Sequence, residues 1–473
     1  MQGGPSYFTN RISTARNIPI YKIMYLFPLI IVAVICNCIH SSNCGTISSE
    51  LLSKLRNGQK VDAILELPSV FGKVMSNPAL KFLTGADKAN MMETLMKQST
   101  SASQAPFMAA INRLGISDSA TPFWISNDIS LTNINLGAIQ SLGALPGVFN
   151  LREQFVAKLD PVVRGNRVSR ATFNETIQKY PHWGVDKIQA PAAWSRTKGE
   201  NVLVAIIDSG VYMEHEALRD GYTGKWLDAT SDASTTPIDP NGHGTHALGT
   251  ILGRTNNIGV APRAKWIACR AMTQHGGGLE SWIKTCGQWV YQQRPGVVSN
   301  SWSIANGGTS TSFDDVIKSW RAIGIIPVFA SGNSGDNCGS ARYPGNHPDV
   351  ISVGSTRRDD GISSFSGRGP SPKGLIKPQI AAPGEFIVSA DNTDPKGYKN
   401  LSGTSMACPH GAGVVALLLL ANPSWKYDDV LQALIRTAER PPITKECVSS
   451  NTTSYPNNAY GNGRINAKRA VGL

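Results

Sequence analysis

Continuous apolar strands alternate with helical segments over the C-terminal part of this sequence. Val202–Ile207 is apolar at every position, and helical patterns follow at Gly242–Leu252, Leu279–Gln293 and Ser312–Ile323. A strand that is apolar on both faces must be covered on both faces, and strands that alternate with helices form parallel sheets. Residues 181–473 are therefore expected to fold as a doubly wound, mostly parallel α/β domain.

Three side chains lie where such strands end or where the following helices begin. Asp208 directly follows the apolar strand, His243 stands between two glycines at the start of the next helix, and Ser405 opens a long apolar helix. A serine hydroxyl is a weak nucleophile until a base takes its proton, and an imidazole base needs a fixed negative partner. Sites in these sheets lie beyond the carboxyl ends of the strands, so the three residues are predicted to form one catalytic group.

An oxyanion site is predicted beside Ser405. Its backbone N–H belongs to the first turn of a helix, where donors are unpaired and the helix dipole favours negative charge. Asn333 follows the apolar strand Ile326–Ala330 in a glycine-containing turn and offers an amide donor. Taken singly, the serine also fits an ordinary helix cap and the asparagine an ordinary turn; the combination favours catalysis.

Together these segments resemble the subtilisin-like serine proteases, the subtilase family. The chain order Asp, His, Ser matches that family. The matching motifs are Ile207-Asp208-Ser209-Gly210, Gly242-His243-Gly244-Thr245-His246, Ala330-Ser331-Gly332-Asn333 and Gly403-Thr404-Ser405-Met406-Ala407. Two further segments, Gly259–Pro262 and Trp266–Arg270, are similar to the bacillopeptidase F group.

The resemblance implies a serine endopeptidase that works through an acyl-enzyme. Asp208 would orient His243, which would act as general base and then general acid while Ser405 attacks the peptide carbonyl. A cleft-lining strand and turn would bind protein or peptide substrates through Ser299, Asn300, Ser301, Trp302, Ser303, Ala330, Ser331 and Gly332. Because residues 300–308 contain no carboxylate, cleavage after basic residues is not expected, and a broad preference for apolar or small residues is.

Residues 46–151 show a second pattern, with strands and helices in the order β-α-β-β-α-β. That order fits a small ferredoxin-like α+β domain. The resemblance implies an inhibitory propeptide, to which Gln104 and Phe123–Asn127 are similar, and hence a zymogen inhibited by its own propeptide. Residues 152–180 are charged and broken by proline and glycine, so a processing linker is expected there. Its Arg-x-x-Arg spacing at Arg164, Arg167 and Arg170 fits a processing site or a solvated loop.

The N-terminal segment 1–44 predicts export. Basic residues and no acid precede the apolar run Ile23–Cys36, which is long enough for a signal peptide and short for a membrane span. A secreted protein is expected, with a type II membrane anchor as the alternative. Sequons at Asn174 and Asn451 are candidates for glycosylation, whereas Asn400 lies close to Ser405 and is a poor one.

Export makes disulfides possible. After removal of a signal segment, Cys408 beside the nucleophile is expected to be a small buried filler. The other four allow two disulfides in three pairings: Cys269, Cys286, Cys338 and Cys447.

Several other classes are disfavoured. The net charge is +12, but no long basic run or nucleic-acid motif is present, so nucleic acid is not an expected partner. No cofactor or metal is expected; calcium is conceivable near Asp391, Asn392 and Asp394, although the loop Gly253–Gly259 is shorter than the usual calcium loop of subtilisins. A monomer is expected. The alternatives are a catalytically silent subtilase fold used for binding, and a sedolisin-like acid peptidase, whose carboxylate base would leave His243 unexplained.

Overall fold

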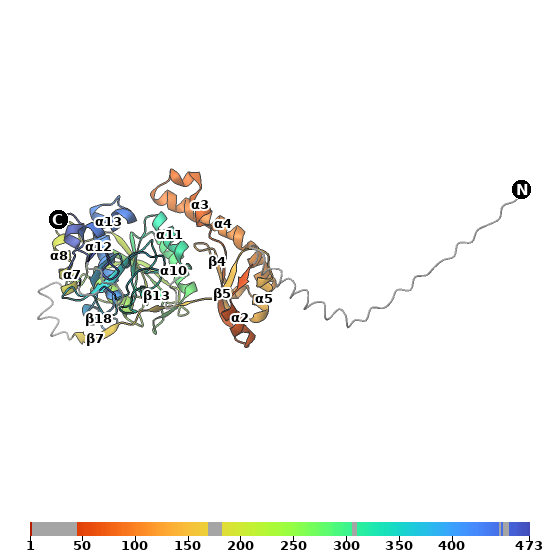
Figure 1. Ribbon diagram of the computed structural model, residues 1–473, viewed down its shortest axis with the longest axis horizontal. Helices are drawn as coiled ribbons and strands as arrows, with labels where there is room; N and C mark the ends of the chain where they lie inside the picture. Colours follow the sequence, from red (N-terminus) through yellow and green to blue (C-terminus); the bar gives the residue numbers. More distant parts are fainter. Residues whose placement is uncertain (2–44, 169–181, 305–309, 444–445, 448–453) are drawn as a thin grey trace.

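The structure, a computed structural model, describes residues 1, 45–168, 182–304, 310–443, 446–447 and 454–473. It contains a small N-terminal α+β unit that lies beside a larger α/β unit (Figure 1). The predicted signal segment, Arg170, Asn174 and Asn451 fall outside the described residues.

A seven-stranded parallel sheet forms the centre of the larger unit, as the apolar strands predict. Its strand order is β16-β15-β14-β12-β8-β10-β9. The strands are β8 (Leu203–Asp208), β9 (Tyr222–Asp228), β10 (Lys265–Arg270), β12 (Val297–Asn300), β14 (Ile326–Ala330), β15 (Ile351–Thr356) and β16 (Ile380–Pro383). Because β8 is the first of these in the chain yet lies inside the sheet, the strand order reverses there. Its carboxyl end is where ligands bind in such sheets.

Helices cover both faces of this sheet. One face carries α9 (His243–Leu252), α12 (Thr404–Ala421) and α13 (Tyr427–Thr437), and the other carries α10 (Glu280–Gln293) and α11 (Asp314–Ala322). Along β8, Val204 and Ile206 enter the first core, while Ala205 and Ile207 enter the second. This alternation explains why the strand is apolar at every position.

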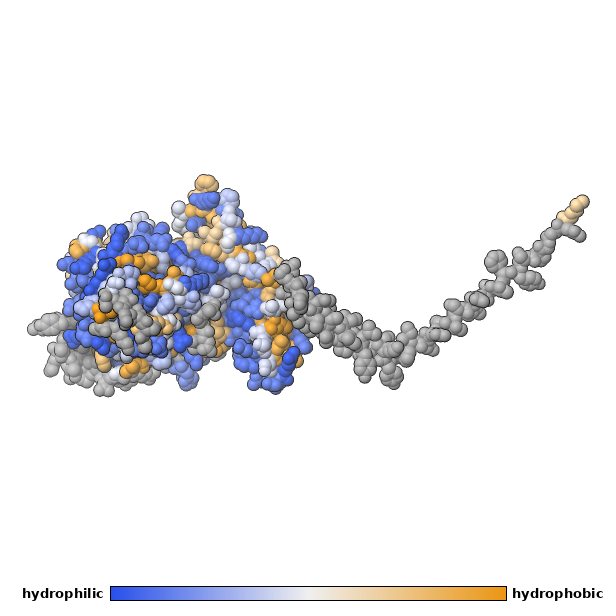
Figure 2. Space-filling model, in the orientation of Figure 1, coloured by the Kyte–Doolittle hydropathy of each residue, from blue (hydrophilic) through white to orange (hydrophobic). Residues whose placement is uncertain are grey.

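The apolar helix α12 is a core helix. Among the described residues it alone has the length and composition to cross a membrane, and 83% of its apolar window is buried inside the protein. The interpretation of Val414–Ala421 as core is therefore confirmed. Figure 2 shows mostly hydrophilic side chains on the visible face of both units, with hydrophobic ones in small groups.

The N-terminal unit has the predicted ferredoxin-like core. Its strands β2 (Val61–Glu66), β3 (Ala120–Phe123), β4 (Asp128–Ile134) and β5 (Asn150–Glu153) are arranged in the order β5-β2-β4-β3, with the short β1 (Thr46–Ile47) added beside β5. Its helices are α2 (Ser49–Arg56), α3 (Phe71–Met75), α4 (Gly85–Arg113) and α5 (Leu136–Gly143). Met92 and Met96 of α4 and Ile125 pack into the same core as α10, so the two units share apolar contacts.

The segment expected as a linker, 152–180, differs from that expectation over its described part. Strand β6 (Val156–Leu159) lies between β11 (Gly277–Leu279) and β13 (Trp302–Ile304), antiparallel to both. Strand β7 (Val163–Val168) pairs with β18 (Tyr398–Ser402), which also pairs with β17 (Ile387–Ala390). Proline, glycine and charge favoured a loop, but the free edges of β11, β13 and β18 supply hydrogen-bond partners that local sequence does not reveal.

Two disulfides tie the larger unit together. Cys269 of β10 is bonded to Cys286 of α10, and Cys338 to Cys447, so the structure selects one of the three open pairings. Cys408 is a buried free thiol, as predicted. The short helices α7 (Trp183–Lys187), α8 (Ala190–Ala193) and α14 (Ala467–Ala470) complete this unit.

Candidate active site

The carboxylate and the imidazole predicted from the sequence meet at the carboxyl end of β8. Nδ1 of His243, the first residue of α9, lies 2.8 Å from Oδ1 of Asp208. Both side chains are buried, and the same carboxylate oxygen accepts a hydrogen bond from the Ser209 backbone N–H at 2.7 Å. The contact fixes the proton of a neutral imidazole on Nδ1 and leaves Nε2 as the basic nitrogen.

Two features hold α9 against Asp208. A Cβ on Gly244 would lie 2.1 Å from the Gly210 carbonyl oxygen, so only glycine allows this close approach. Asp239 accepts hydrogen bonds from the Gly242 and Thr245 backbone N–H groups at 2.7 and 2.8 Å, which caps the helix. Asp239 was not predicted from the sequence, although an acidic residue a few positions before a helix is a usual signal of a helix cap.

The electrostatics of this site favour a protonated imidazole. Burial alone would lower the pKa of His243, but the charge of Asp208, the hydrogen bond to it and the charge of Asp239 outweigh burial. The net effect raises the pKa of His243 above its ordinary value. The imidazolium that forms during acyl transfer would therefore be stabilised. The neighbouring His246 is structural, because its Nε2 lies 2.9 Å from the Ile387 carbonyl oxygen and burial keeps its pKa well below the usual range.

Ser405 lies in the first turn of α12, as predicted. Its Oγ donates to the Ser301 carbonyl oxygen at 3.4 Å, and the Ser405 side chain is fully buried. Within the described residues, Nε2 of His243 has no hydrogen-bond partner. The hydrogen bond expected between Ser405 and His243 is thus not made in this arrangement, in which strand β6 lies between β11 and β13 and Pro161 contacts Asn333. Hydrogen bonds of this kind often form only with a reacting substrate.

Asn333 is oriented as an oxyanion donor would be. Its Oδ1 accepts from the backbone N–H and the hydroxyl of Thr404 at 2.8 and 2.7 Å. Its Nδ2 donates to the Pro161 carbonyl oxygen at 3.0 Å. The amide already binds a peptide carbonyl of the segment that fills the cleft.

The other predicted cleft residues divide into two groups. Ser301 contacts Ser405, Trp302 pairs with Leu159 through its backbone, and Ser303 donates to Asp160. The remaining side chains turn into the interior or the turn behind the cleft. Ser299 contacts Cys408 and Asn300 bonds to backbone carbonyls, Ala330 belongs to a hydrophobic core, and Ser331 and Gly332 pack beside Arg342.

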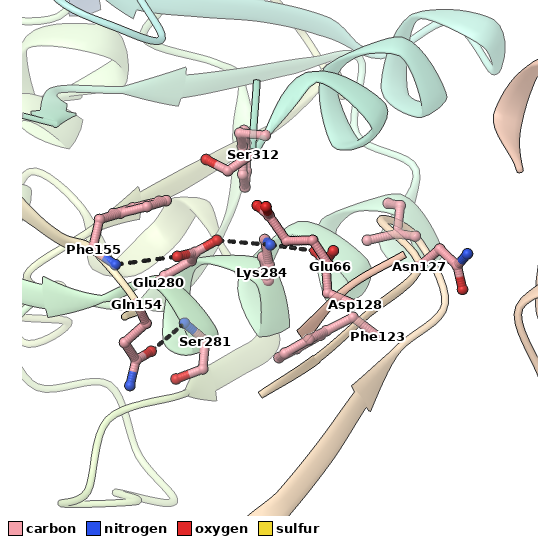
Figure 3. A network of polar contacts seen from close by, with 12 residues as sticks. Glu66, Phe123, Asn127, Asp128, Gln154, Phe155, Glu280, Ser281, Lys284 and Ser312 are labelled. Atoms are coloured by element: carbon pink, nitrogen blue, oxygen red, sulfur yellow. Dashed lines mark hydrogen bonds and ion pairs between the residues drawn. The ribbon is translucent and has the colours of Figure 1, made fainter. Parts of the chain in front are cut away.

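A buried ion network joins the N-terminal unit to the first turns of α10 (Figure 3). Glu280 is fully buried and lies 2.7 Å from Arg152 and 2.8 Å from Lys284, which in turn contacts Asp128. Each charge has a partner on the other unit, so the network requires both units in place. A buried charge that loses its partner is costly, which makes this contact specific.

Hydrogen bonds around Gln104 extend the same interface. This buried residue of α4 donates to the Phe123 carbonyl oxygen at 3.0 Å and so holds the turn before β4. The Trp124 and Ile125 N–H groups of that turn donate to Gln288 of α10 at 2.8 and 3.3 Å. Phe123–Asn127 is thus one of the segments of the N-terminal unit that α10 binds.

The acidic loop that was considered for calcium is occupied by local bonds. Asp391 lies 3.2 Å from the Lys399 ammonium and accepts from the Asn392 N–H and the Thr393 hydroxyl. No group of three His, Cys, Asp or Glu side chains that could hold a metal occurs within the described ranges. These residues do not fit a calcium site, since a cation would have to displace the lysine.

The family model and the related proteins indicate the same family. Residues 199–463 match the model of the subtilase family of peptidases. Bacillopeptidase F of Bacillus subtilis is 38% identical over 324 residues, covering 61% of this chain but 22% of that protein. The chain thus spans about a fifth of the length of that relative.

Shorter relatives are covered almost completely. Subtilisin Savinase of Lederbergia lenta is 34% identical, with 61% of this chain and 98% of that protein aligned. Thermitase of Thermoactinomyces vulgaris is 33% identical, with 63% of this chain and 99% of that protein aligned.

Proposed function

The chain belongs to the subtilase family of serine-type endopeptidases, and we propose that it hydrolyses protein substrates with Ser405 as nucleophile, His243 as base and Asp208 as the orienting carboxylate. The observation that supports this most is the 2.8 Å contact between His243 and Asp208 at the strand end where α12 also begins. The orientation of the Asn333 amide supports it independently.

The reaction follows from these positions. Oγ of Ser405 attacks the carbonyl carbon of the peptide, and its proton passes to Nε2 of His243. The Asn333 amide and the Ser405 N–H bind the oxyanion, which is where preorganised donors contribute most. The C–N bond then breaks as His243 returns the proton to the leaving amine. Water repeats the sequence on the acyl-enzyme and releases the acid.

We further propose that residues 46–151 act as an inhibitory propeptide and that the protein is made as a zymogen. Strand β6 supports this, because it pairs with β11 and β13 as an extended substrate would. The segment that follows then passes Asn333 and joins β18. Substrate and propeptide therefore compete for the same strand edges.

Secretion is part of the same proposal. The basic and apolar segment within residues 1–44 suggests export, and the two disulfides support an oxidising compartment. A type II anchor would use the same segment. A signal peptide predicts a secreted protein that lacks residues 1–44. An anchor predicts a membrane-bound protein that keeps them.

Replacement of the nucleophile tests the proposal. Ser405→Ala is expected to abolish peptide hydrolysis and to leave the N-terminal unit joined to the rest of the chain. Ser195→Ala, an exposed serine after α8, serves as the matched control and should behave as the wild type. Hydrolysis or self-processing by Ser405→Ala at the wild-type rate would refute the assignment.

A further inference from the structure

Asp160 directly follows β6 and places its side chain in a pocket of the cleft. The preceding residue, Leu159, donates its backbone N–H to the Gly276 carbonyl oxygen at 2.8 Å, so the chain is still held as an extended strand at this point. Only 8% of Asp160 is exposed, and its Oδ1 accepts from the Ser303 hydroxyl at 2.7 Å. A buried aspartate in a substrate cleft requires partners that compensate for lost hydration.

The position of this pocket identifies the substrate residue that it receives. Ser303 lies on the same strand segment as Ser301, whose carbonyl oxygen contacts the Ser405 hydroxyl. The backbone N–H of Asn333 lowers the pKa of the Asp160 carboxyl. The side chain of Asn333 is the proposed oxyanion donor. The pocket therefore adjoins both the nucleophile and the oxyanion site. The pocket is assigned to the residue before the reacting bond, whose carbonyl would take the place of the Pro161 carbonyl at Asn333 when a substrate reacts.

Arg342 packs against the turn that leads to Asn333, and its charge acts on Asp160. Its backbone N–H donates to the Ser331 carbonyl oxygen at 2.9 Å, and its Nε donates to the Ser334 hydroxyl. A Cβ on Gly332 would lie 2.8 Å from Cγ of Arg342, so the arginine stem packs directly against the turn that precedes Asn333. The arginine is thereby held at this turn by its stem and by the Ser334 hydroxyl.

Donors and positive charges around Asp160 offset part of the cost of its burial. Burial raises the pKa of its carboxyl, and the Ser303 hydroxyl, Arg342, His243 and the Asn333 N–H act in the opposite direction without reversing the rise. Within the described residues, Oδ2 has no hydrogen-bond partner. The pocket thus combines hydroxyl and amide donors with a positive charge, as carboxylate binding requires.

We propose that this pocket makes the peptidase cleave after acidic residues, aspartate or glutamate, with Arg342 as the residue that determines this specificity. The proposal rests on the proposed function of the site and replaces the broad apolar or small preference expected from the sequence. That expectation considered only residues 300–308, whereas the charge comes from a distant loop.

The test uses processed enzyme and peptides that differ only in the residue before the cleaved bond: Asp, Glu, Asn, Leu or Arg. The wild type is expected to cleave the Asp peptide with a kcat/KM about 10- to 100-fold above that of the Asn peptide, since a hydrogen-bonded charge is discriminated to this extent. Mass spectrometry of the products locates the bond. Cleavage after the residue that follows Asp would overturn the assignment of the pocket.

Arg342 variants then test the specificity residue. Arg342→Gln is expected to bring the Asp/Asn ratio close to 1, Arg342→Lys to keep it above 1, and Arg342→Glu to favour the Arg peptide. Arg357→Gln, an exposed arginine paired with Asp359, is the matched control and should keep the wild-type ratio. Labelling of Ser405 by a fluorophosphonate shows that each variant is folded.

The outcomes separate the two proposals. A processed wild-type enzyme that neither cleaves peptides nor labels at Ser405 would refute the proposed function itself. An active enzyme that favours the Leu peptide, or an Arg342→Gln variant with the wild-type Asp/Asn ratio, would overturn only the acidic specificity.

Discussion

Nδ1 of His243 lies 2.8 Å from Oδ1 of Asp208, and both side chains are buried at the carboxyl end of β8. The pair joins the first strand of the sheet to the first residue of α9. It leaves Nε2 as the nitrogen able to take a proton from Ser405. Each of the predictions below depends on this pair or on the segment that fills the cleft beside it.

The pH dependence of hydrolysis should follow His243. Catalysis needs the neutral imidazole, and the contact with Asp208 raises the pKa of His243 above its ordinary value. The rate is therefore expected to rise with pH, with a midpoint above ~6.5, the unperturbed pKa of histidine. A kcat/KM profile of processed enzyme measures this. A midpoint below that value, or a flat profile between pH 5 and 8, would contradict the role of the pair.

Loss of the Asn333 amide should affect turnover more than binding. Asn333→Ala is expected to lower kcat by ~10²–10³ with little change in KM, a magnitude established on subtilisin itself. Thr404→Val should cost less, because the Thr404 backbone N–H still holds Oδ1 of Asn333 at 2.8 Å. Steady-state kinetics of both variants check the order. Equal kcat values for Asn333→Ala and wild type would remove Asn333 from the oxyanion site.

Pro161 should protect one bond of the intact chain, the bond after Asp160, from Ser405. The bond after Asp160 has a proline nitrogen, which carries ring carbons and no N–H. Pro161→Ala is expected to allow cleavage between residues 160 and 161 in the full chain, detected by N-terminal sequencing. The double variant with Ser405→Ala should stay uncut. If the Pro161→Ala chain also stays uncut between residues 160 and 161, Ser405 does not reach that bond.

The buried ion network should hold the N-terminal unit in place. In a Ser405→Ala chain, Asp128→Ala leaves Lys284 short of a partner and is expected to weaken docking by about 3–5 kcal/mol. Hydrogen exchange at the Trp124 and Ile125 amides, which bind Gln288, should become faster. Lys54→Ala removes an exposed pair with Glu153 and is the matched control, expected to have little effect. Unchanged exchange in Asp128→Ala would show that the network does not carry the docking.

The sheet and the contact between Asp208 and His243 could be predicted because their signals are local. Val202–Ile207 is apolar on both faces, and Asp208, His243 and Ser405 each stand at the end of an element beside glycines. The cap formed by Asp239 was a local signal that went unused.

Other features depend on pairing between distant segments. Strand β6 forms only because β11 and β13 offer free edges, so its charged and proline-containing surroundings suggested a linker. The choice of Cys269 with Cys286 and of Cys338 with Cys447 needs Cα separations of 5.6 and 5.2 Å, which spacing along the chain does not give. Arg342, whose charge acts on Asp160, comes from a loop for which the sequence offers no signal.

Covalent labelling shows whether Ser405 is the nucleophile and whether its reactivity depends on His243. Processed enzyme is treated with a fluorophosphonate, digested and mapped by mass spectrometry, with His243→Ala and Ser195→Ala chains treated in parallel. A single adduct on Ser405 is expected, which is lost in His243→Ala and kept in Ser195→Ala. An active enzyme labelled at another residue, or labelled at Ser405 equally fast without His243, would contradict this expectation.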